Sequence, residues 1–430
     1  MTHRRRLASK CKARFIGGVI CRGLRGRCLA VVIDLGWCDG QNGEMQFDAS
    51  GGSGVTVKSD GKNPEAGGIR ARLRQFFFEA MRRVAGIDDT REILAEMLRA
   101  GNAIPAPGEM AWMGRESRPY GDLGQTVVSA PAPSRAAVFV TGRFRSGSTL
   151  MWNIFRHVPG VTSYYEPFNE RRWFDVGGRG VRVDQTHLGV SDYWVEYDHL
   201  SELGQYFDEA WKFRRLYMYG TSYDAPMQRY IETMIERAPG RPVLQFNEVD
   251  FRLGWLRAWF PGVPIIHIFR HPRDQWCSTL QEAAKSAAQC RLRDFQAYDG
   301  FYLLRWARDL RLTFPFLSLD GDAFAYELYY QVWKLSYLFG QRYAELSLRF
   351  EDLIADPRST IRKILETAGM PEVDVEPLVR LVSPVRTGKW RECADADWFS
   401  EIEARVDATI ARYVGAVSAA QRSNTSVVRS

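Results

Sequence analysis

The chain has 430 residues, and 58 Lys and Arg against 51 Asp and Glu give it a formal net charge of +7. Its hydrophobic fraction of 45% and charged fraction of 25% are those of a globular protein with a core. The length allows one large domain with an appendage, or two domains. The positive charge favours anionic partners, such as a nucleotide, an acidic substrate, a nucleic acid or an anionic lipid surface, without choosing among them.

Seven cysteines in a chain of this length exclude a disulfide framework, and their odd number points the same way. Because no C-x-x-C pair occurs, the N-terminal group of Cys11, Cys21, Cys28 and Cys38 is not expected to bind zinc. A reducing compartment is favoured, and we expect a cytoplasmic protein. No apolar run reaches the roughly 18 residues of a membrane span, since the stretch "CLAVVIDLGW" is broken by Asp34.

Residues 1–70 form a basic, low-complexity extension that we expect to be largely disordered. Its first 30 residues carry many Arg and Lys and no acidic residue, which fits a transit peptide, a basic arm or an incorrectly assigned start of translation. Residues 39–68 are rich in Gly, Ser and Asp and have little periodicity, so they are predicted to be linker or disorder.

Residues 71–130 are interpreted as a helical segment followed by a linker. Apolar residues recur at helical spacing on one face: Leu73, Phe76, Phe77, Ala80 and Val84. Such a basic amphipathic helix, near residues 70–84, either contacts a membrane surface or covers a core, and the second interpretation is favoured. Asp89 and Glu92 predict the start of a second helix that continues through Leu98. Residues 101–135 are predicted to be a loop ending in "SAPAPS".

From Ala136 the pattern changes to short apolar segments that alternate with helical ones. The predicted strands are "AAVFVT" (136–141), "VTSYYEP" (161–167), "PVLQFN" (242–247), "VPIIHIF" (263–269) and "LSLRF" (346–350). Strands this apolar are typical of a parallel sheet covered on both faces. We therefore predict a P-loop-type, three-layer α/β/α domain with a central parallel sheet over residues 131–418, followed by a tail at 419–430.

The first predicted strand leads into "GRFRSGST", which has the glycine spacing of a Walker A loop without its lysine. Gly142 and Gly147 keep the spacing, Ser148 stands at the lysine position, and Thr149 follows. A strand, a glycine-containing loop and a helix present backbone N–H groups and the positive end of the helix dipole to an anion. Because the strand "VPIIHIF" ends in Arg270 rather than in a Mg²⁺-binding Asp, ATP hydrolysis is the weaker interpretation.

Four segments in this order resemble the sulfotransferases that use 3′-phosphoadenosine 5′-phosphosulfate (PAPS), in particular the bacterial and carbohydrate-type members. They are the "RSGST" loop, "FRHPRDQWCS" with Arg270 and Ser278 eight positions apart, "LRFEDLIADP", and "RTGKWRE". Their order and spacing agree with that family from about residue 136 to residue 415, whereas residues 1–130 have no such match. The resemblance implies a sulfotransferase with PAPS as donor and without a required metal.

The resemblance also assigns the donor contacts. The residues implied to bind the donor are Arg143, Arg145, Ser146, Gly147, Ser148, Thr149, Leu150, Arg270, Ser278, Arg386, Gly388, Lys389 and Trp390. Of these, the loop would bind the 5′-phosphosulfate, Arg270 and Ser278 the 3′-phosphate, and residues 386–390 would close over the nucleotide. Two alternatives remain: Arg270 pairs only with Asp274, and Arg143 is a solvated loop charge rather than a catalytic group.

Two residues are expected to carry the chemistry. Arg145 is the candidate to replace the missing lysine by stabilising the leaving phosphate. Glu166 resembles the glutamate base of carbohydrate sulfotransferases, and its place before Pro167 puts it at a strand end, where open α/β sheets bind ligands. Burial would have to raise its pKa for this role. The other candidate bases are Glu170, His157 and His271, and the alternative for Glu166 is an ion pair with a loop arginine; His267 is expected to be a buried strand residue.

The acceptor is an unidentified hydroxyl. Segments 171–240 and 283–330 are rich in Trp, Tyr, Phe and Arg, which is compatible with a carbohydrate, a lipid-linked sugar or a small aryl molecule, although aromatic residues at helical spacing are more often core. No nucleic-acid partner is expected, and the oligomeric state is not predicted. The competing functions are a P-loop kinase, a nucleic-acid-binding protein that uses the basic N-terminal arm, and a catalytically silent PAPS-binding module.

Overall fold

The computed structural model of the chain describes residues 19–22, 28–31, 126–128, 137–179, 183, 187 and 189–427. They fall into two units, one within residues 1–84 and the other within residues 85–430. The linker predicted at residues 39–68 and the helices predicted near 70–84 and 89–98 lie outside the described residues.

In the first unit, strands β1 (Val19–Arg22) and β2 (Cys28–Val31) form an antiparallel hairpin, with Val19 opposite Val31 and Arg22 opposite Cys28. The sequence predicts no regular structure here. Each strand has 4 residues, so neither is long enough to show a periodic pattern above the polar sequence around it.

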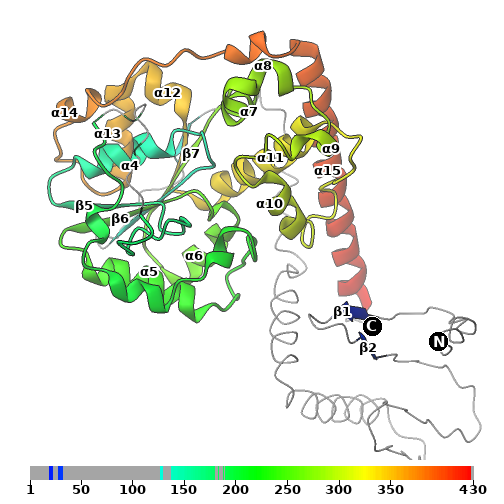
Figure 1. Cartoon of the computed structure of the whole chain (residues 1–430), viewed down its shortest axis with the longest axis horizontal. Helices are drawn as coiled ribbons and strands as arrows, with labels where there is room; N and C mark the ends of the chain where they lie inside the picture. Colours follow the sequence, from blue (N-terminus) through cyan, green and yellow to red (C-terminus); the bar gives the residue numbers. More distant parts are fainter. Residues whose placement is uncertain are drawn as a thin grey trace, which may run out of the picture. The chain divides into compact units, whose positions relative to one another are not determined.

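The second unit is built around a six-stranded sheet in the order β3-β8-β7-β4-β6-β5. Figure 1 labels three of its strands, β5, β6 and β7. The strands are β3 (Val127–Val128), β4 (Val138–Thr141), β5 (Val161–Tyr165), β6 (Arg241–Phe246), β7 (Ile265–Phe269) and β8 (Leu346–Arg349). Strands β4 to β8 pair in parallel, which confirms all five predicted strands and the parallel sheet.

Strand β3 corrects one prediction, because the sequence predicts a loop throughout residues 101–135. Val127 and Val128 instead pair antiparallel with β8 at the edge of the sheet. The Thr126 hydroxyl fastens this edge by donating to Asp352 at 2.5 Å and accepting from the Arg349 amide at 3.1 Å. A two-residue strand held by distant residues leaves no local sequence pattern.

Helices cover both faces of the sheet, as the three-layer prediction requires. On one face, Val138 and Val140 pack in a core cluster with residues of helices α4, α12, α13 and α14. On the other face, Phe139 belongs to a larger aromatic cluster that includes α5, α6, α10 and α11 (Figure 1). The α-helices are α4 (Ser148–Arg156), α5 (Ala225–Arg237), α6 (Leu253–Trp259), α7 (Pro272–Leu280), α8 (Ala284–Ala287), α9 (Leu292–Phe295), α10 (Leu303–Leu310), α11 (Ala325–Tyr343), α12 (Phe350–Ala355), α13 (Pro357–Thr367), α14 (Glu376–Val379) and α15 (Ala396–Val427).

The strand order determines where a ligand can bind. β4 lies between β7 and β6, and β5 lies on the far side of β6. Because these strands are parallel, the segments that follow them meet at one edge of the sheet, the usual ligand-binding edge of open α/β sheets. No helix in the described part of the chain is both long and apolar enough to cross a bilayer.

Candidate active site

The loop after β4 forms the strand–loop–helix arrangement that the sequence predicts. Helix α4 begins at Ser148, and Gly147 precedes it with a φ of 100°. A Cβ on Gly147 would lie 2.4 Å from the Phe350 ring, and one on Gly142 would lie 2.6 Å from the Ile268 carbonyl oxygen. Both positions therefore require glycine, and the first amides of α4 face the carboxyl edge of the sheet.

The loop side chains lie in different surroundings. Ser148 Oγ donates to Asn247 Oδ1 at 2.9 Å, and the Thr149 hydroxyl lies 3.1 Å from the Tyr165 hydroxyl. Leu150 packs against the core cluster of the α4 face, so only its backbone amide is suited to an anion. The two loop hydroxyls thus contact Asn247, which directly follows β6, and Tyr165, the last residue of β5.

Arg143 is not a solvated loop charge, and that part of the sequence interpretation is wrong. The side chain is only 5% exposed, and its guanidinium carbon lies 4.8 Å from the centre of the Trp306 ring. Nε and Nη1 have no hydrogen-bond partner among the residues that the structure describes. Burial lowers the pKa of Arg143, since desolvation disfavours the charged form. The buried guanidinium thus has two donors available for an anion.

The Arg270 and Ser278 motif lies next to the loop, as its position on the adjacent strand requires. Arg270 directly follows β7, and Ser278 lies in α7. Arg145 Nε donates to Ser278 Oγ at 3.0 Å, and Arg270 Nη1 donates to the Arg145 carbonyl at 3.4 Å. The structure thereby brings together three residues that the sequence assigned to donor binding.

Arg270 also has an unused donor. Its Nε is buried without a hydrogen-bond partner in the described part of the chain, as is the hydroxyl of Ser146. None of the ion pairs among the described residues joins Arg270 to Asp274. Burial lowers the pKa of Arg270, and the charge of Asp274 partly offsets that decrease. The phenol of Tyr329 interacts electrostatically with both Arg143 and Arg270, so both guanidinium groups lie in the neighbourhood of this phenol.

The "LRFEDLIADP" segment supports these two motifs. The Phe350 ring lies against Gly147, and the guanidinium carbon of Arg270 is 5.1 Å from the ring centre. Glu351 Oε1 accepts from the backbone amide of His271 at 3.0 Å, directly after Arg270. The segment therefore positions the donor residues.

The loop that contains residues 386–390 is attached to α7 through one carboxylate. Asp274 accepts from the amides of Gly388 at 2.7 Å and Trp390 at 3.2 Å. Trp390 is buried, and its ring stacks on His271 with an interplanar angle of 13°. The loop is thus fixed beside the helix that carries Ser278.

Arg386 and Lys389 are not brought into the cluster. Arg386 pairs with Glu392, and the side chain of Lys389 is exposed. Among the described residues, no hydrogen bond joins either side chain to the loop after β4. Their assignment to donor binding stays a prediction.

Glu166 lies at the end of β5 and is buried, with 7% of its surface exposed. Its Oε2 accepts from Asn169 Nδ2 at 2.5 Å, and its Oε1 accepts from Asn247 Nδ2. No ion pair in the described part of the chain joins it to a loop arginine. Burial raises the pKa of Glu166 above the ordinary glutamate value, and the hydrogen bonds from Asn169 and Tyr165 oppose this increase.

The other candidate bases have structural roles or partners. His157 contacts the carbonyl of Asn153 in its own helix at 2.9 Å. His267 is buried in β7, as predicted, and burial lowers its pKa to about 4. Burial likewise lowers the pKa of His271 to about 4. Glu170 forms an ion pair with Lys212.

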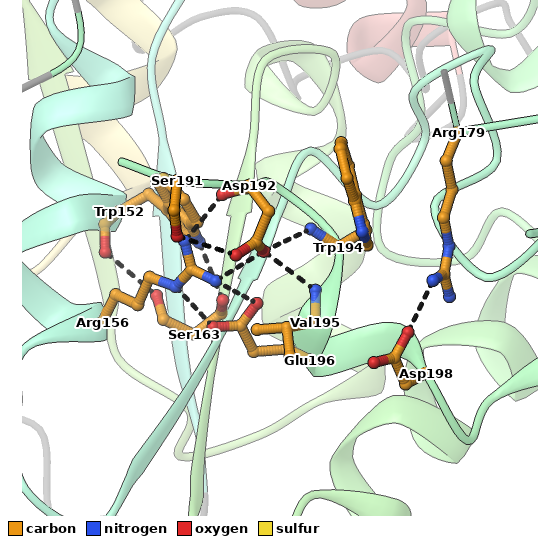
Figure 2. Close-up of polar contacts among 10 residues, drawn as sticks. All are labelled: Trp152, Arg156, Ser163, Arg179, Ser191, Asp192, Trp194, Val195, Glu196 and Asp198. Carbon is orange, nitrogen blue, oxygen red and sulfur yellow. Dashed lines mark hydrogen bonds and ion pairs between the residues drawn. The ribbon is translucent and has the colours of Figure 1, made fainter. Parts of the chain in front are cut away.

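Figure 2 shows how β5 is anchored to α4 through Ser163, the middle residue of the strand. Trp152 Nε1 donates to the Ser163 carbonyl at 2.7 Å, and Ser163 Oγ donates to the Trp152 carbonyl at 3.2 Å. At the end of the same helix, Arg156 pairs with Asp192 and Glu196, each at 2.7 Å. These contacts make the loop helix and the strand that leads to Glu166 a single packed unit.

The structure adds residues that the sequence analysis did not single out. Asn247 and Glu248 directly follow β6, and Lys212 interacts electrostatically with Glu166 and Glu248. Glu248 is fully buried, and its Oε1 has no hydrogen-bond partner within the described ranges. Burial and the charge of Glu166 raise the pKa of Glu248 to about 7. The polar "NE" directly after an apolar strand was the available signal.

Comparison with known proteins identifies the family of the chain. A family model described as "Sulfotransferase family" matches residues 137–374, more than half of the chain. No curated protein matches the chain. Among solved structures, similarity is found to sulfotransferase STF9 from Mycobacterium avium, at 14% identity and a TM-score of 0.33 over 65% of this chain and 77% of that chain. A sulfotransferase from Alicyclobacillus acidocaldarius matches at 16% identity and a TM-score of 0.31 over 64% and 96%.

The chain belongs to the sulfotransferase family. The family and the α/β fold support a transferase, as the sequence resemblance implies. The described residues contain no group of three or more His, Cys, Asp or Glu side chains arranged to hold a metal ion.

Proposed function

We propose that this sulfotransferase transfers the sulfuryl group of PAPS to a hydroxyl of its acceptor. The observation that carries the proposal is a set of buried, unused donors beside the loop after β4: Arg143 Nε and Nη1, Ser146 Oγ and Arg270 Nε. Burying such donors without partners costs about 1–3 kcal/mol each. An anionic ligand at the carboxyl edge of the sheet would offset this cost.

The residues present fit a ligand with two separated anionic groups. The loop amides, Arg145, Ser148 and Thr149 would hold the phosphosulfate at the start of α4. Arg270 and Ser278 would hold the 3′-phosphate, which distinguishes PAPS from ATP. Two anion sites on adjacent strands, β4 and β7, are what such a donor requires.

In the transfer step, PAPS supplies an activated sulfuryl group. Glu166 accepts the proton of the acceptor hydroxyl, and burial favours this because it brings the pKa of Glu166 closer to neutral. Arg145 stabilises the charge that develops on the departing phosphate oxygen. Arg145 is exposed and already reaches Ser278, so its side chain connects the two anion sites.

The test is calorimetric binding of 3′,5′-ADP, 5′-ADP and ATP with Mg²⁺ to the full chain. We expect 3′,5′-ADP to bind most tightly, and Arg270→Ala to weaken its binding by about 2–5 kcal/mol, the cost of removing one partner of a buried charge pair. The control is Arg358→Ala, because Arg358 is an exposed residue of α13 that pairs with Glu376.

Three results decide between the candidate functions. Tighter binding of ATP with Mg²⁺ than of 3′,5′-ADP would contradict the proposal and favour the kinase hypothesis. Preference for 3′,5′-ADP that Arg270→Ala abolishes, followed by transfer of label from PAPS to a hydroxyl compound, would support the proposal. Donor binding without turnover of any acceptor would favour a silent binding module.

A further inference from the structure

The residue that directly follows β6 occupies a special place in the sheet. β6 lies between β4 and β5, so Asn247 stands between the loop that follows β4 and Glu166, which follows β5. Asn247 is only 2% exposed. A buried side chain at this position is able to contact both the anion loop and the carboxylate.

Asn247 contacts both. Its Oδ1 accepts from Ser148 Oγ at 2.9 Å and from Gln245 Nε2 at 3.0 Å. Its Nδ2 donates to Glu166 Oε1. One amide therefore joins the first residue of α4 to the carboxylate at the end of β5.

The partners fix the orientation of this amide. If the amide were flipped, its NH₂ would face the Gln245 NH₂ and its oxygen would face the Glu166 carboxylate, and both contacts would be repulsive. In the observed orientation an N–H points at the carboxylate, which favours its ionised form and lowers the pKa.

Burial raises the pKa of Glu166, and the groups that oppose this increase are Asn169, Tyr165, Lys212 and Arg171. Glu248 faces Glu166 as well, and the charge of Glu166 raises the pKa of Glu248. The hydrogen bond from Asn247 acts on Glu166 in the same direction as those from Asn169 and Tyr165.

Ser148 gives this contact a dependence on the loop ligand. A hydroxyl has a single hydrogen to donate, and in this structure it points at Asn247 Oδ1. An anion at the start of α4 competes for that hydrogen. When the Ser148 hydroxyl donates to the anion instead, Gln245 is left as the donor to Asn247 Oδ1. The strength of the hydrogen bond from Asn247 Nδ2 to Glu166 then changes.

We propose that Asn247 is a positioning residue that keeps Glu166 ionised and couples its pKa to anion binding at Ser148. The inference rests on the proposed function, since it makes Glu166 the base and the loop the donor site. It assigns Asn247 no contact with the reacting atoms.

The principal test is Asn247→Asp, which keeps the size of the side chain and the acceptor for Ser148 but places a carboxylate against Glu166. Like charges raise the pKa of the group that ionises last. A base works when deprotonated, so the acidic limb of the kcat/KM profile should move up by about 1 pH unit or more. Activity should recover at higher pH, which structural damage would not produce. Gln341→Glu is the matched control, because Gln341 donates to Ser347 away from the site.

A second measurement does not depend on turnover. The pKa of Glu166 is followed by ¹³C NMR of labelled glutamate carboxylates, assigned with Glu166→Gln. It should be higher in ligand-free Asn247→Asp than in the wild type. Adding 3′,5′-ADP should shift it in the wild type but not in Ser148→Ala. If Asn247→Asp does not fold, Asn247→Ala provides the same comparison, with an increase expected from the loss of the donated hydrogen bond.

The outcomes separate the two proposals. An unchanged pKa of Glu166 and an unchanged pH profile in folded Asn247 variants would overturn the role of Asn247, even if 3′,5′-ADP binds. Failure of the wild type to bind 3′,5′-ADP would overturn the proposed function instead, and the ligand-free pKa comparison would still test the contact between Asn247 and Glu166.

Discussion

Replacing Arg143 by methionine should make the ligand-free protein more stable and abolish its response to the donor. The guanidinium is almost completely buried, and two of its nitrogens have no hydrogen-bond partner among the described residues. Methionine fills a similar volume without a charge or a polar donor. The substitution therefore removes a desolvation cost while preserving most of the packing.

The magnitude follows from the contacts. Two unsatisfied donors cost about 1–3 kcal/mol each. The contact with Trp306 at 4.8 Å returns about 1–2 kcal/mol, and the charges of Asp250 and Asp299 offset a further part. The net gain in unfolding free energy for Arg143→Met is then about 1–3 kcal/mol, or a rise in Tm of about 1–3 °C for a chain of 430 residues.

The assay is thermal unfolding with and without 3′,5′-ADP. A ligand present at 100 times its Kd stabilises the native state by about 2.7 kcal/mol, and we expect this increase in the wild type but little of it in Arg143→Met. Arg358→Met is the control, because its guanidinium is exposed. A lower Tm together with an intact ligand response would refute the reasoning. Arg143 would then be a structural cation held by Asp250 and Asp299.

Two other residues give predictions of a different kind. The pKa of Glu248 is about 7 in the fold, against about 4.3 in an unfolded chain. The contribution of Glu248 to the free energy of unfolding is therefore complete below pH 4.3 and is lost as the pH rises towards and through 7. Between pH 5 and pH 8, Glu248→Gln should therefore gain up to a few kcal/mol of unfolding free energy relative to the wild type, as measured by urea unfolding. The same difference between variant and wild type at pH 5 and at pH 8 would contradict this. Asp274→Asn replaces one of the acceptors for Gly388 and Trp390 with an NH₂ group, at a cost of about 1–3 kcal/mol. Limited trypsin digestion should cleave at Lys389 faster than in the wild type, and 3′,5′-ADP should bind about 10-fold more weakly; unchanged cleavage would mean that Asp274 does not hold the loop.

The parts of the site that follow from local sequence were predictable. The loop after β4 needs glycine at two positions because the Phe350 ring and the Ile268 carbonyl leave no room for a Cβ. The spacing of eight residues places Arg270 at the end of a strand and Ser278 on the following helix, as found. Such features depend on neighbours in the chain, so their residue types and intervals are visible in the sequence.

The burial of Arg143 could not be predicted from the local sequence. A lone arginine in a glycine-containing loop is normally solvated. Here Trp306, which comes from α10, covers the guanidinium, and no local pattern links the two positions. The same holds for Lys212, whose pairing with Glu170 and contact with Tyr302 depend on the packing of three distant segments.

The contact between Glu166 and Asn247 could not be predicted from the local sequence either. The position of Glu166 at the end of β5 was visible in the sequence, but its hydrogen bond from Asn247 forms only because β6 is inserted between β4 and β5. A sheet ordered along the sequence would have placed β5 beside β4, with no residue between the loop and the carboxylate. The crossover therefore creates the contact that the proposed coupling uses.

The missing lysine can now be explained by the charges around the loop. Ser148, at the lysine position, is buried, donates its hydrogen to Asn247 and carries no charge. Positive charge comes instead from Arg143 and Arg145 within the loop and from Arg270, which directly follows the adjacent strand β7. A phosphoryl group bears more negative charge than a sulfuryl group and requires a lysine and a metal at one point. Arginines that follow two different strands suit a ligand with two separated anionic groups, as the proposed donor has.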